Sequence, residues 1–247
     1  MKQIPDIPYL EDGREEHRLD IYLPEHENFD TVLWFHGGGL EEGNRKACDM
    51  QEYYTRRGCG FVSAEYRLYP GARFPEYLED AADAAAYIVR HIGDYGGSGR
   101  VFITGQSAGA YITMMLCMDR HFLEARGISQ DRIAGYISDS AQQCCHYNVL
   151  RELGQDTRLE RIDLHAPIYY ADRVSRLRPL LLLFYEDDIP CRPEENRLLY
   201  ANLRRLHPEA VVQIDSLPGT HCSRSETPDG EPLVCEKTYR FMESLKK

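Results

Sequence analysis

The sequence predicts one α/β domain, built on a mainly parallel sheet with helices on both faces. Apolar segments of strand length alternate with helical patterns along the chain, as they do in βαβ units. The chain has 247 residues, a length that one α/β domain often fills. We find no internal repeat and no low-complexity segment, so residues 1–247 are expected to form a single domain.

The first half of the chain is expected to contain three strands and one helix. The strands are short apolar segments rich in β-branched and aromatic residues, and they cover Leu19–Leu23, Thr31–Phe35 and Gly60–Arg67. The helix covers Glu76–His91, a segment rich in alanine, and Gly93 ends it.

The second half continues the alternation. A strand over Val101–Thr104 leads into a helix over Ala108–His121, in which Met114, Met115 and Met118 recur at helical spacing. We expect these methionines to pack in the core, because their flexible apolar side chains fill irregular gaps. The remaining expected elements are strands over Ile133–Ser138, Pro179–Tyr185 and Val211–Ile214 and a helix over Glu194–Leu206.

The charge of the chain disfavours two classes of partner. Its 29 basic and 40 acidic residues give a formal net charge of −11, and a surface this acidic repels the phosphates of nucleic acid and of anionic lipid. No apolar run approaches the ~18 residues that a membrane span needs, and the N-terminus lacks a signal-peptide pattern. We expect a cytoplasmic protein without nucleic-acid or membrane partners, for which a homodimer is a possible assembly.

The eight cysteines are scattered along the chain. Nothing in the sequence suggests export, so we expect free thiols in a reducing compartment rather than disulfides. The run Cys144-Cys145-His146, with Cys191 and Cys222 elsewhere, matches no familiar zinc spacing. The sequence therefore predicts no metal site.

The first chemical motif, Gly105-x-Ser107-x-Gly109, joins an expected strand to an expected helix. On such a turn a nucleophilic serine is lifted above the end of the sheet, and flanking glycines remove the Cβ atoms that would clash. The alternative is a glycine-rich turn whose serine caps the helix. The strand before the motif and the helix after it favour Ser107 as a nucleophile.

A second motif, His36-Gly37-Gly38-Gly39, follows the second expected strand. Its glycines let backbone N–H groups point into a cavity, where such donors stabilise the oxyanion of a tetrahedral intermediate. The N–H of Ala108, directly after the nucleophile, would supply another donor. We expect His36 to support this loop by hydrogen bonding rather than to act as a base, and a merely flexible loop is the alternative.

An acid and a histidine follow the serine, in the order that a nucleophile elbow of this kind uses. Glu186, Asp187 and Asp188 come directly after the apolar strand that ends at Tyr185, and His221 follows the next strand. Both positions are carboxyl ends of strands, where an open α/β sheet places its site. Of the nine histidines only His221 has this placement, so we expect it to be the base.

Residues 142–177 show no clean alternation, and we interpret them as a small insertion, or cap, over the active site. His146 and His165 lie in this segment, and structural or solvent-facing roles are expected for both. Three of its aromatic side chains have two open interpretations, binding of a sugar or phenolic group and plain core packing; they are Tyr147, Tyr169 and Tyr170.

Five segments occur in an order that resembles a known group of enzymes. They are Leu19-Asp20-Ile21-Tyr22-Leu23-Pro24, His36-Gly37-Gly38-Gly39, Tyr66-Arg67-Leu68 with Pro70, Phe74-Pro75 with Asp80, and Gly105-Gln106-Ser107-Ala108-Gly109. In these segments the chain resembles the hormone-sensitive-lipase-like carboxylesterases and the neighbouring acetylesterases of the α/β-hydrolase superfamily. The resemblance covers nearly the whole chain and implies the α/β-hydrolase fold. It also implies that the N–H groups of Gly38, Gly39 and Ala108 form the oxyanion hole.

The resemblance also indicates which acid completes the site. Members of the family carry this acid in a Gly-x-x-Asp-Pro-like stretch, in whose place the chain has Tyr185-Glu186-Asp187-Asp188-Ile189. That alignment favours Asp188. Because the glycine and the proline are both missing here, Asp187 stays open as the alternative.

Only 35 residues precede His36, whereas larger members of the family build part of a cap from a longer N-terminal arm. A reduced cap implies an open pocket and a short acyl group. The resemblance therefore implies a serine carboxylesterase that hydrolyses small, acetyl-like esters through an acyl-enzyme, with Ser107, His221 and Asp188 as its triad and no cofactor. Two alternatives stay open: an amidase of the arylformamidase kind, and a hydrolase-fold protein that binds a small ligand without turnover.

Overall fold

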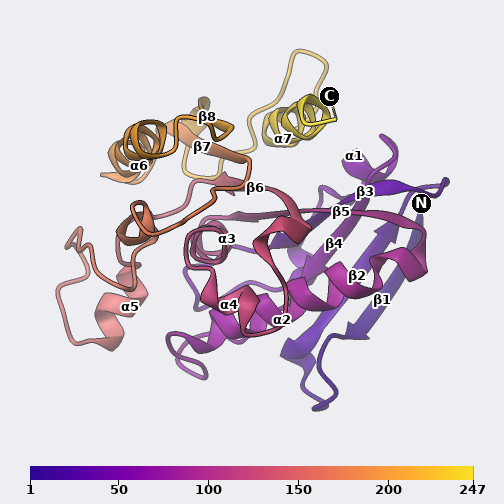
Figure 1. The fold of residues 1–247 in the computed structure, drawn as a ribbon, viewed down its shortest axis with the longest axis horizontal. Helices are drawn as coiled ribbons and strands as arrows, with labels where there is room; N and C mark the ends of the chain where they lie inside the picture. The colour runs from indigo at the N-terminus through magenta and orange to yellow at the C-terminus, as the bar shows by residue number, and fades with distance from the viewer. Residues whose placement is uncertain (247) are drawn as a thin grey trace.

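The computed structural model describes residues 1–246 and contains one eight-stranded sheet, shown in Figure 1. The strands are β1 (Lys2–Pro8), β2 (Arg18–Leu23), β3 (Phe29–Phe35), β4 (Gly60–Ala64), β5 (Gly97–Gln106), β6 (Ile133–Asp139), β7 (Leu180–Asp187) and β8 (Val212–Thr220). Their order in the sheet is β1-β2-β4-β3-β5-β6-β7-β8. β2 pairs antiparallel with β1 and β4, and all the other neighbours pair in parallel. The predicted fold class is therefore confirmed.

Helices cover both faces of this sheet. They are α1 (Gln51–Thr55), α2 (Glu76–His91), α3 (Ala108–Met118), α4 (His121–Glu124), α5 (Tyr147–Glu152), α6 (Arg192–Leu206) and α7 (Leu233–Ser244), and short 3₁₀ helices cover Glu15–His17, Arg45–Ala47, Ile92–Tyr95, Gln130–Arg132 and Pro167–Tyr170. Figure 1 shows α1 and α7 on one side of the sheet and α2 and α3 on the other. Two separate groups of buried residues fill the layers, one against α2, α3 and α6 and one against α1 and α7.

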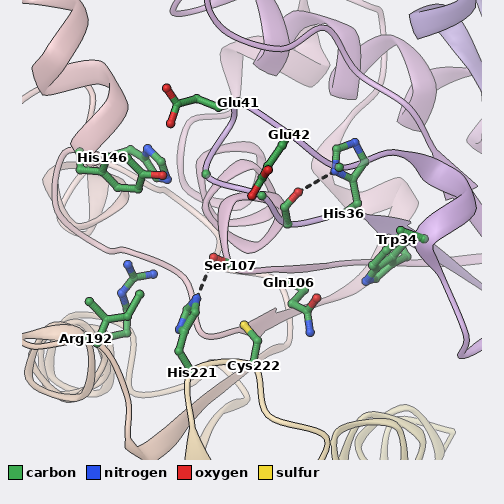
Figure 2. A pocket seen from close by; sticks show the side chains of 17 residues that line it. Trp34, His36, Glu41, Glu42, Gln106, Ser107, His146, Arg192, His221 and Cys222 are labelled. Atoms are coloured by element: carbon green, nitrogen blue, oxygen red, sulfur yellow. Dashed lines mark hydrogen bonds between the residues drawn. The ribbon is translucent and has the colours of Figure 1, made fainter.

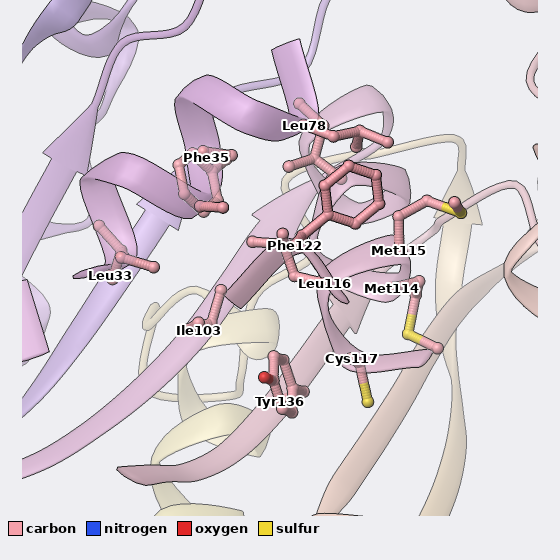
Figure 3. Packing of buried hydrophobic residues seen from close by; sticks show 14 of the residues in the cluster. Leu33, Phe35, Leu78, Ile103, Met114, Met115, Leu116, Cys117, Phe122 and Tyr136 are labelled. Atoms are coloured by element: carbon pink, nitrogen blue, oxygen red, sulfur yellow. The ribbon is translucent and has the colours of Figure 1, made fainter. Parts of the chain in front are cut away.

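The centre of the sheet is fully covered. Every residue of β3 and β4 is buried, because helices on both faces of a parallel sheet leave no strand face to water. In α3, Met114, Met115 and Met118 are all buried, and Figure 3 shows the first two among the packed side chains of the core. The prediction that these methionines pack in the core is confirmed.

Some elements were not predicted from the sequence, and some helices and strands end at other residues than predicted. β1 contains Pro5 and Pro8, which normally interrupt a strand, but an edge strand tolerates them because one of its sides forms no ladder. In α7 the buried positions include a cysteine and a threonine, which weaken the apolar signal. α3 ends at Met118 rather than at His121, since Asp119 has an extended backbone. β4 ends at Ala64 rather than at Arg67.

Two further features of the structure concern its cysteines and the length of its helices. The eight cysteines are free in the structure. No helix among residues 1–246 is both long enough and apolar enough to cross a bilayer.

Candidate active site

The candidate site lies where four parallel strands end. Ser107 follows β5, Ser140 follows β6, Asp188 follows β7 and His221 follows β8, and these strands are successive neighbours in the sheet. Parallel neighbours present their carboxyl ends at one edge, where open α/β sheets bind their ligands. Residues far apart in sequence therefore converge there.

Ser107 occupies a strained turn between β5 and α3. Its backbone has φ 54° and ψ −113°, a region that residues with a Cβ rarely adopt. The flanking glycines are required by close packing. A Cβ on Gly105 would lie 2.2 Å from the carbonyl O of Gly109, and a Cβ on Gly109 would lie 2.1 Å from that of Phe35. The turn presents Ser107 to a pocket that its side chain helps to line.

Ser107, His221 and Asp188 form one hydrogen-bonded row. Ser107 Oγ lies 2.8 Å from His221 Nε2, and His221 Nδ1 lies 2.5 Å from Asp188 Oδ1. Figure 2 marks the first of these hydrogen bonds with a dashed line. The Asp188 side chain is fully buried, whereas 22% of the His221 side chain is exposed. The hydroxyl can therefore donate to the imidazole, and the imidazole can donate its other N–H to a carboxylate.

Of the three consecutive acids after the apolar strand, Asp188 makes the contact with His221. Glu186 and Asp187 are exposed at the end of β7, and within residues 1–246 neither of them is hydrogen-bonded to His221. The structure thus brings together the three residues that the sequence singles out as a triad. Their catalytic roles belong to the proposal below.

Ser140 is a site residue that the sequence analysis missed. Its hydroxyl donates to Asp188 Oδ2 and lies 3.1 Å from His221 Nδ1, and Asp188 also accepts the backbone N–H of Tyr185 at 3.1 Å. Burial raises the pKa of Asp188, but the hydrogen bonds from His221, Ser140 and Tyr185 outweigh it and hold this pKa below its usual value. Its position in the sequence could have indicated this role. Ser140 directly follows a predicted strand, as Ser107 and Asp188 do, and that strand lies between theirs along the chain.

The glycine loop lies beside the serine. His36 Nδ1 lies 2.7 Å from the carbonyl O of Gly37, and its Nε2 lies 2.8 Å from Glu65 Oε1, so His36 supports the loop as expected. Gly37, Gly38 and Gly39 all line the pocket. Ala108 is the first residue of α3 and directly follows Ser107. The oxyanion role of Gly38, Gly39 and Ala108 stays a prediction.

The pocket has a volume of about 900 Å³ and is mixed in character. Its lining residues are Trp34, His36, Gly37, Gly38, Gly39, Glu41, Glu42, Gly43, Ala47, Gln106, Ser107, His146, Tyr147, Ile189, Arg192, His221 and Cys222. From residues 142–177, this lining includes only His146 and Tyr147. Burial lowers the pKa of His146 to about 3, so its imidazole is neutral; its Nδ1 accepts the backbone N–H of Asn148 at the start of α5.

The three tyrosines for which both substrate binding and core packing were considered lie in different environments. Tyr147 lines the pocket. Tyr169 and Tyr170 pack edge to face, 5.1 Å between ring centres, against the hydrophobic core. His165 is paired with Asp163 and lies against Phe74. Of these three tyrosines, only Tyr147 lies where it can contact a molecule in the pocket.

Two clusters outside the pocket lining could hold a metal ion by proximity. They are Cys145 with Asp163 and His165, and Cys144 with Glu160 and Glu195, and the ligand atoms within each cluster lie within 4.8 Å of one another. In both clusters a carboxylate is already engaged. Asp163 accepts the backbone N–H of His165 at 2.9 Å, and Glu195 accepts that of Cys144 at 2.8 Å. The expectation of no metal stays a prediction.

Solved structures share the fold at low sequence identity. A bifunctional GH43-CE protein of Bacteroides eggerthii is 19% identical, with a TM-score of 0.78, and the match covers 99% of this chain but only 35% of that one. A truncated carbohydrate esterase from gut microbiota is 17% identical, with a TM-score of 0.77 and coverage of 100% and 97%. The propionate-bound esterase Est2 of Thermogutta terrifontis is 17% identical, with a TM-score of 0.76 and coverage of 97% and 93%.

A family model agrees with these structures. The model described as BD-FAE matches residues 19–149, a range that contains the glycine loop and the Ser107 turn. The resemblance to α/β-hydrolase proteins drawn from the sequence is confirmed. Because the match spans more than half of the 247 residues, the chain belongs to the BD-FAE family.

Proposed function

We propose that the chain is a serine carboxylesterase that hydrolyses small esters with a short, acetyl-like acyl group. One observation carries the proposal: the row of Ser107, His221 and Asp188, with contacts of 2.8 Å and 2.5 Å, opens onto a pocket of about 900 Å³. The chain's family, and the esterases that share its fold, support an ester as the bond that is cleaved.

The geometry is suited to acyl transfer in two halves. His221 takes the proton of Ser107 as Oγ attacks the ester carbonyl, while Asp188 stabilises the imidazolium that forms. Backbone N–H groups of Gly38, Gly39 and Ala108 would hold the oxyanion. His221 then gives the proton to the departing alcohol. Water attacks the acyl-enzyme in the same way, so that the acid is released and the Ser107 hydroxyl is restored.

The short acyl group is the finer part of the proposal. The similar Est2 of Thermogutta terrifontis is described with propionate bound, a short-chain carboxylate. In this chain the N-terminal residues form β1 at the edge of the sheet, and within residues 1–246 no lining residue precedes Trp34. The N-terminal segment therefore does not deepen the pocket.

A substrate panel tests the reaction and the acyl length together. Nitrophenyl esters of increasing chain length are compared with an arylformamide by kcat/KM, and we expect acetyl and butyryl esters to be cleaved best. A preference for acyl chains of about ten carbons or more would contradict a short acyl site, since each methylene typically changes binding by ~1–3 kcal/mol. A faster arylformamide would favour the amidase alternative, and no turnover at all would favour a binding protein.

The nucleophile is tested separately. Ser107→Ala removes the attacking oxygen and should leave a folded protein with almost no esterase activity. An organophosphonate should label the wild type on Ser107, as measured by mass spectrometry of the peptides. Labelling of another serine, together with retained activity in Ser107→Ala, would overturn the proposal.

A further inference from the structure

Arg192 is a buried cation in the pocket that the proposed reaction does not use. It is the first residue of α6 and is only 5% exposed, yet it lines the pocket together with Ser107 and His221. Figure 2 shows its guanidinium turned toward the pocket, between His146 and His221 in this view. Burying a charge is costly unless its N–H groups find acceptors, so the partners of Arg192 matter.

Residues 1–246 supply one hydrogen-bond acceptor for this guanidinium. Nη1 of Arg192 donates to the carbonyl O of Ser140 at 2.6 Å. Among residues 1–246 no carboxylate forms an ion pair with Arg192, its Nε and Nη2 make no hydrogen bond, and the residue lines the pocket. The buried carboxylate of Glu195, on the same helix, instead accepts the backbone N–H groups of Gln143 and Cys144.

Within residues 1–246 no acidic group forms an ion pair with Arg192; its charge acts on the buried Glu195 at longer range, but burial still raises the pKa of Glu195 to about 8. The neighbouring His146 is neutral because burial lowers its pKa to about 3. The acidic lining residues Glu41 and Glu42 are both exposed, and Glu41 is already paired with Arg151. The pocket thus combines one buried cation with an acidic, exposed rim. An anion would be attracted at Arg192 and repelled at the rim, so only one orientation of it is favourable.

We propose that Arg192 binds a carboxylate of the substrate, so that the preferred esters carry a negative charge close to the scissile carbonyl. The Nε and Nη2 edge of a guanidinium matches the two oxygens of a carboxylate, and the bond from Nη1 to Ser140 keeps that edge in place. The inference rests on the proposed esterase function and adds the substrate class. Either the acyl group or the alcohol can carry the carboxylate, and the test separates the two.

Two pairs of esters that differ in charge but hardly in shape provide the test. Monomethyl succinate against methyl 4-methylpentanoate places the charge on the acyl side, and 3-acetoxybenzoate against 3-acetoxybenzamide places it on the alcohol side. In one pair we expect the wild type to favour the anionic ester by about tenfold or more in kcat/KM, chiefly through KM, because charge-assisted hydrogen bonds are strong. Acid release at constant pH measures both pairs.

The variant Arg192→Gln should reduce this preference to about one or below it. The change also disturbs the bond to Ser140, so rates for all esters can fall, but the ratio within a pair cancels that loss. Arg197→Gln makes the same charge change on an exposed residue of α6 outside the pocket lining and should leave the ratio unchanged. If Arg192→Gln does not fold, Arg192→Lys, which keeps the charge but lacks the planar fork, should lose most of the preference.

The inference is overturned if the wild type favours the anionic ester in neither pair, or if the folded Arg192 variant keeps the preference. Failure of the esterase proposal itself would look different. In that case the neutral esters would also resist hydrolysis, and the organophosphonate would leave Ser107 unlabelled.

Discussion

At the scale of single residues, the site selects one carboxylate from three in a row. Successive side chains at the end of β7 point in different directions, so Glu186, Asp187 and Asp188 cannot all face His221. The side chain of Asp188 is fully buried and receives hydrogen bonds from His221, Ser140 and Tyr185, whereas the two preceding residues are exposed. The buried carboxylate is the one that can orient the imidazole.

The first prediction follows from that contrast. Asp188→Asn keeps the shape but offers an amide where a carboxylate should accept the Nδ1 proton of His221, so the wrong tautomer is favoured. We expect kcat to fall by up to ~10⁴. Asp187→Asn removes an exposed charge, whose interactions through water are weak, and should change kcat little. Steady-state kinetics of both variants on an acetyl ester check this, and a similar loss in both would contradict it.

Ser140 is expected to act as a positioning residue through Asp188. Ser140→Ala removes the hydroxyl that donates to Asp188 Oδ2 and should lower kcat by about tenfold or more, since hydrogen bonds to charged groups contribute ~1.5–3 kcal/mol. KM should change less, because Ser140 is not among the pocket-lining residues.

A matched variant separates this role from a structural one. Ser140 has φ 63°, a conformation that glycine adopts without strain. Ser140→Gly lacks the hydroxyl as well but should be more stable than Ser140→Ala in thermal unfolding. If the hydroxyl matters, both variants lose similar activity. Recovery of kcat in the glycine variant would show that the backbone, and not the hydroxyl, is what counts.

At the scale of elements, the elbow depends on how closely α3 approaches the sheet. A Cβ on Gly109 would lie 2.1 Å from the backbone O of Phe35 and 2.5 Å from that of His36. Backbone atoms of a central strand cannot move aside as a flexible side chain can. The helix that presents Ser107 can therefore pack against β3 only with glycine at this position.

A pair of glycine variants tests this contact. Gly109→Ala should destabilise the fold by about 3 kcal/mol or more, at or beyond the upper end of overpacking costs, and should lower activity by displacing Ser107. Gly93→Ala adds a Cβ that meets no atom within 4 Å and should be neutral or stabilising by up to ~1 kcal/mol, because it restricts the unfolded chain. Urea unfolding measures both, and equal effects would refute the packing argument.

At the scale of the whole molecule, the site imposes a stability cost through Asp139 at the end of β6. Burial, followed by the nearby charge of Asp188, raises the pKa of Asp139 from 3.8 to about 7. Below pH 3.8 both the folded and the unfolded states hold the proton. As the pH rises from there through 7, the unfolded state releases it first, so folding stability falls.

The substitution Asp139→Asn removes this titration. Relative to the wild type, the variant should therefore gain unfolding free energy as the pH rises, by about 2–3 kcal/mol between pH 5 and pH 8. Denaturant unfolding of both proteins at the two pH values gives the difference. A difference that stays constant with pH would show that Asp139 does not titrate in this range.

The sequence by itself determined the parts of the molecule that depend on local periodicity and on chain order. Three features were predictable because each depends only on residues close together in the sequence. They are the alternation of strands and helices, the bounds of α2 and the glycine-flanked turn at Ser107. The edge strand β1 was not predictable, since the prolines at positions 5 and 8 interrupt the strand pattern. They are tolerated only because one side of this strand is unpaired.

Tertiary structure alone decided how the site is completed. The contacts from Ser140 to Asp188, from Asp188 to His221 and from Arg192 to Ser140 join residues that lie 48, 33 and 52 positions apart. They form because β6, β7 and β8 are adjacent and parallel in the sheet, and because α6 begins beside their carboxyl ends. A local sequence pattern does not show which strands are adjacent. The sequence therefore favoured Asp188 only through the family resemblance, and its contact with His221 and the buried position of Arg192 form only once the strands have paired.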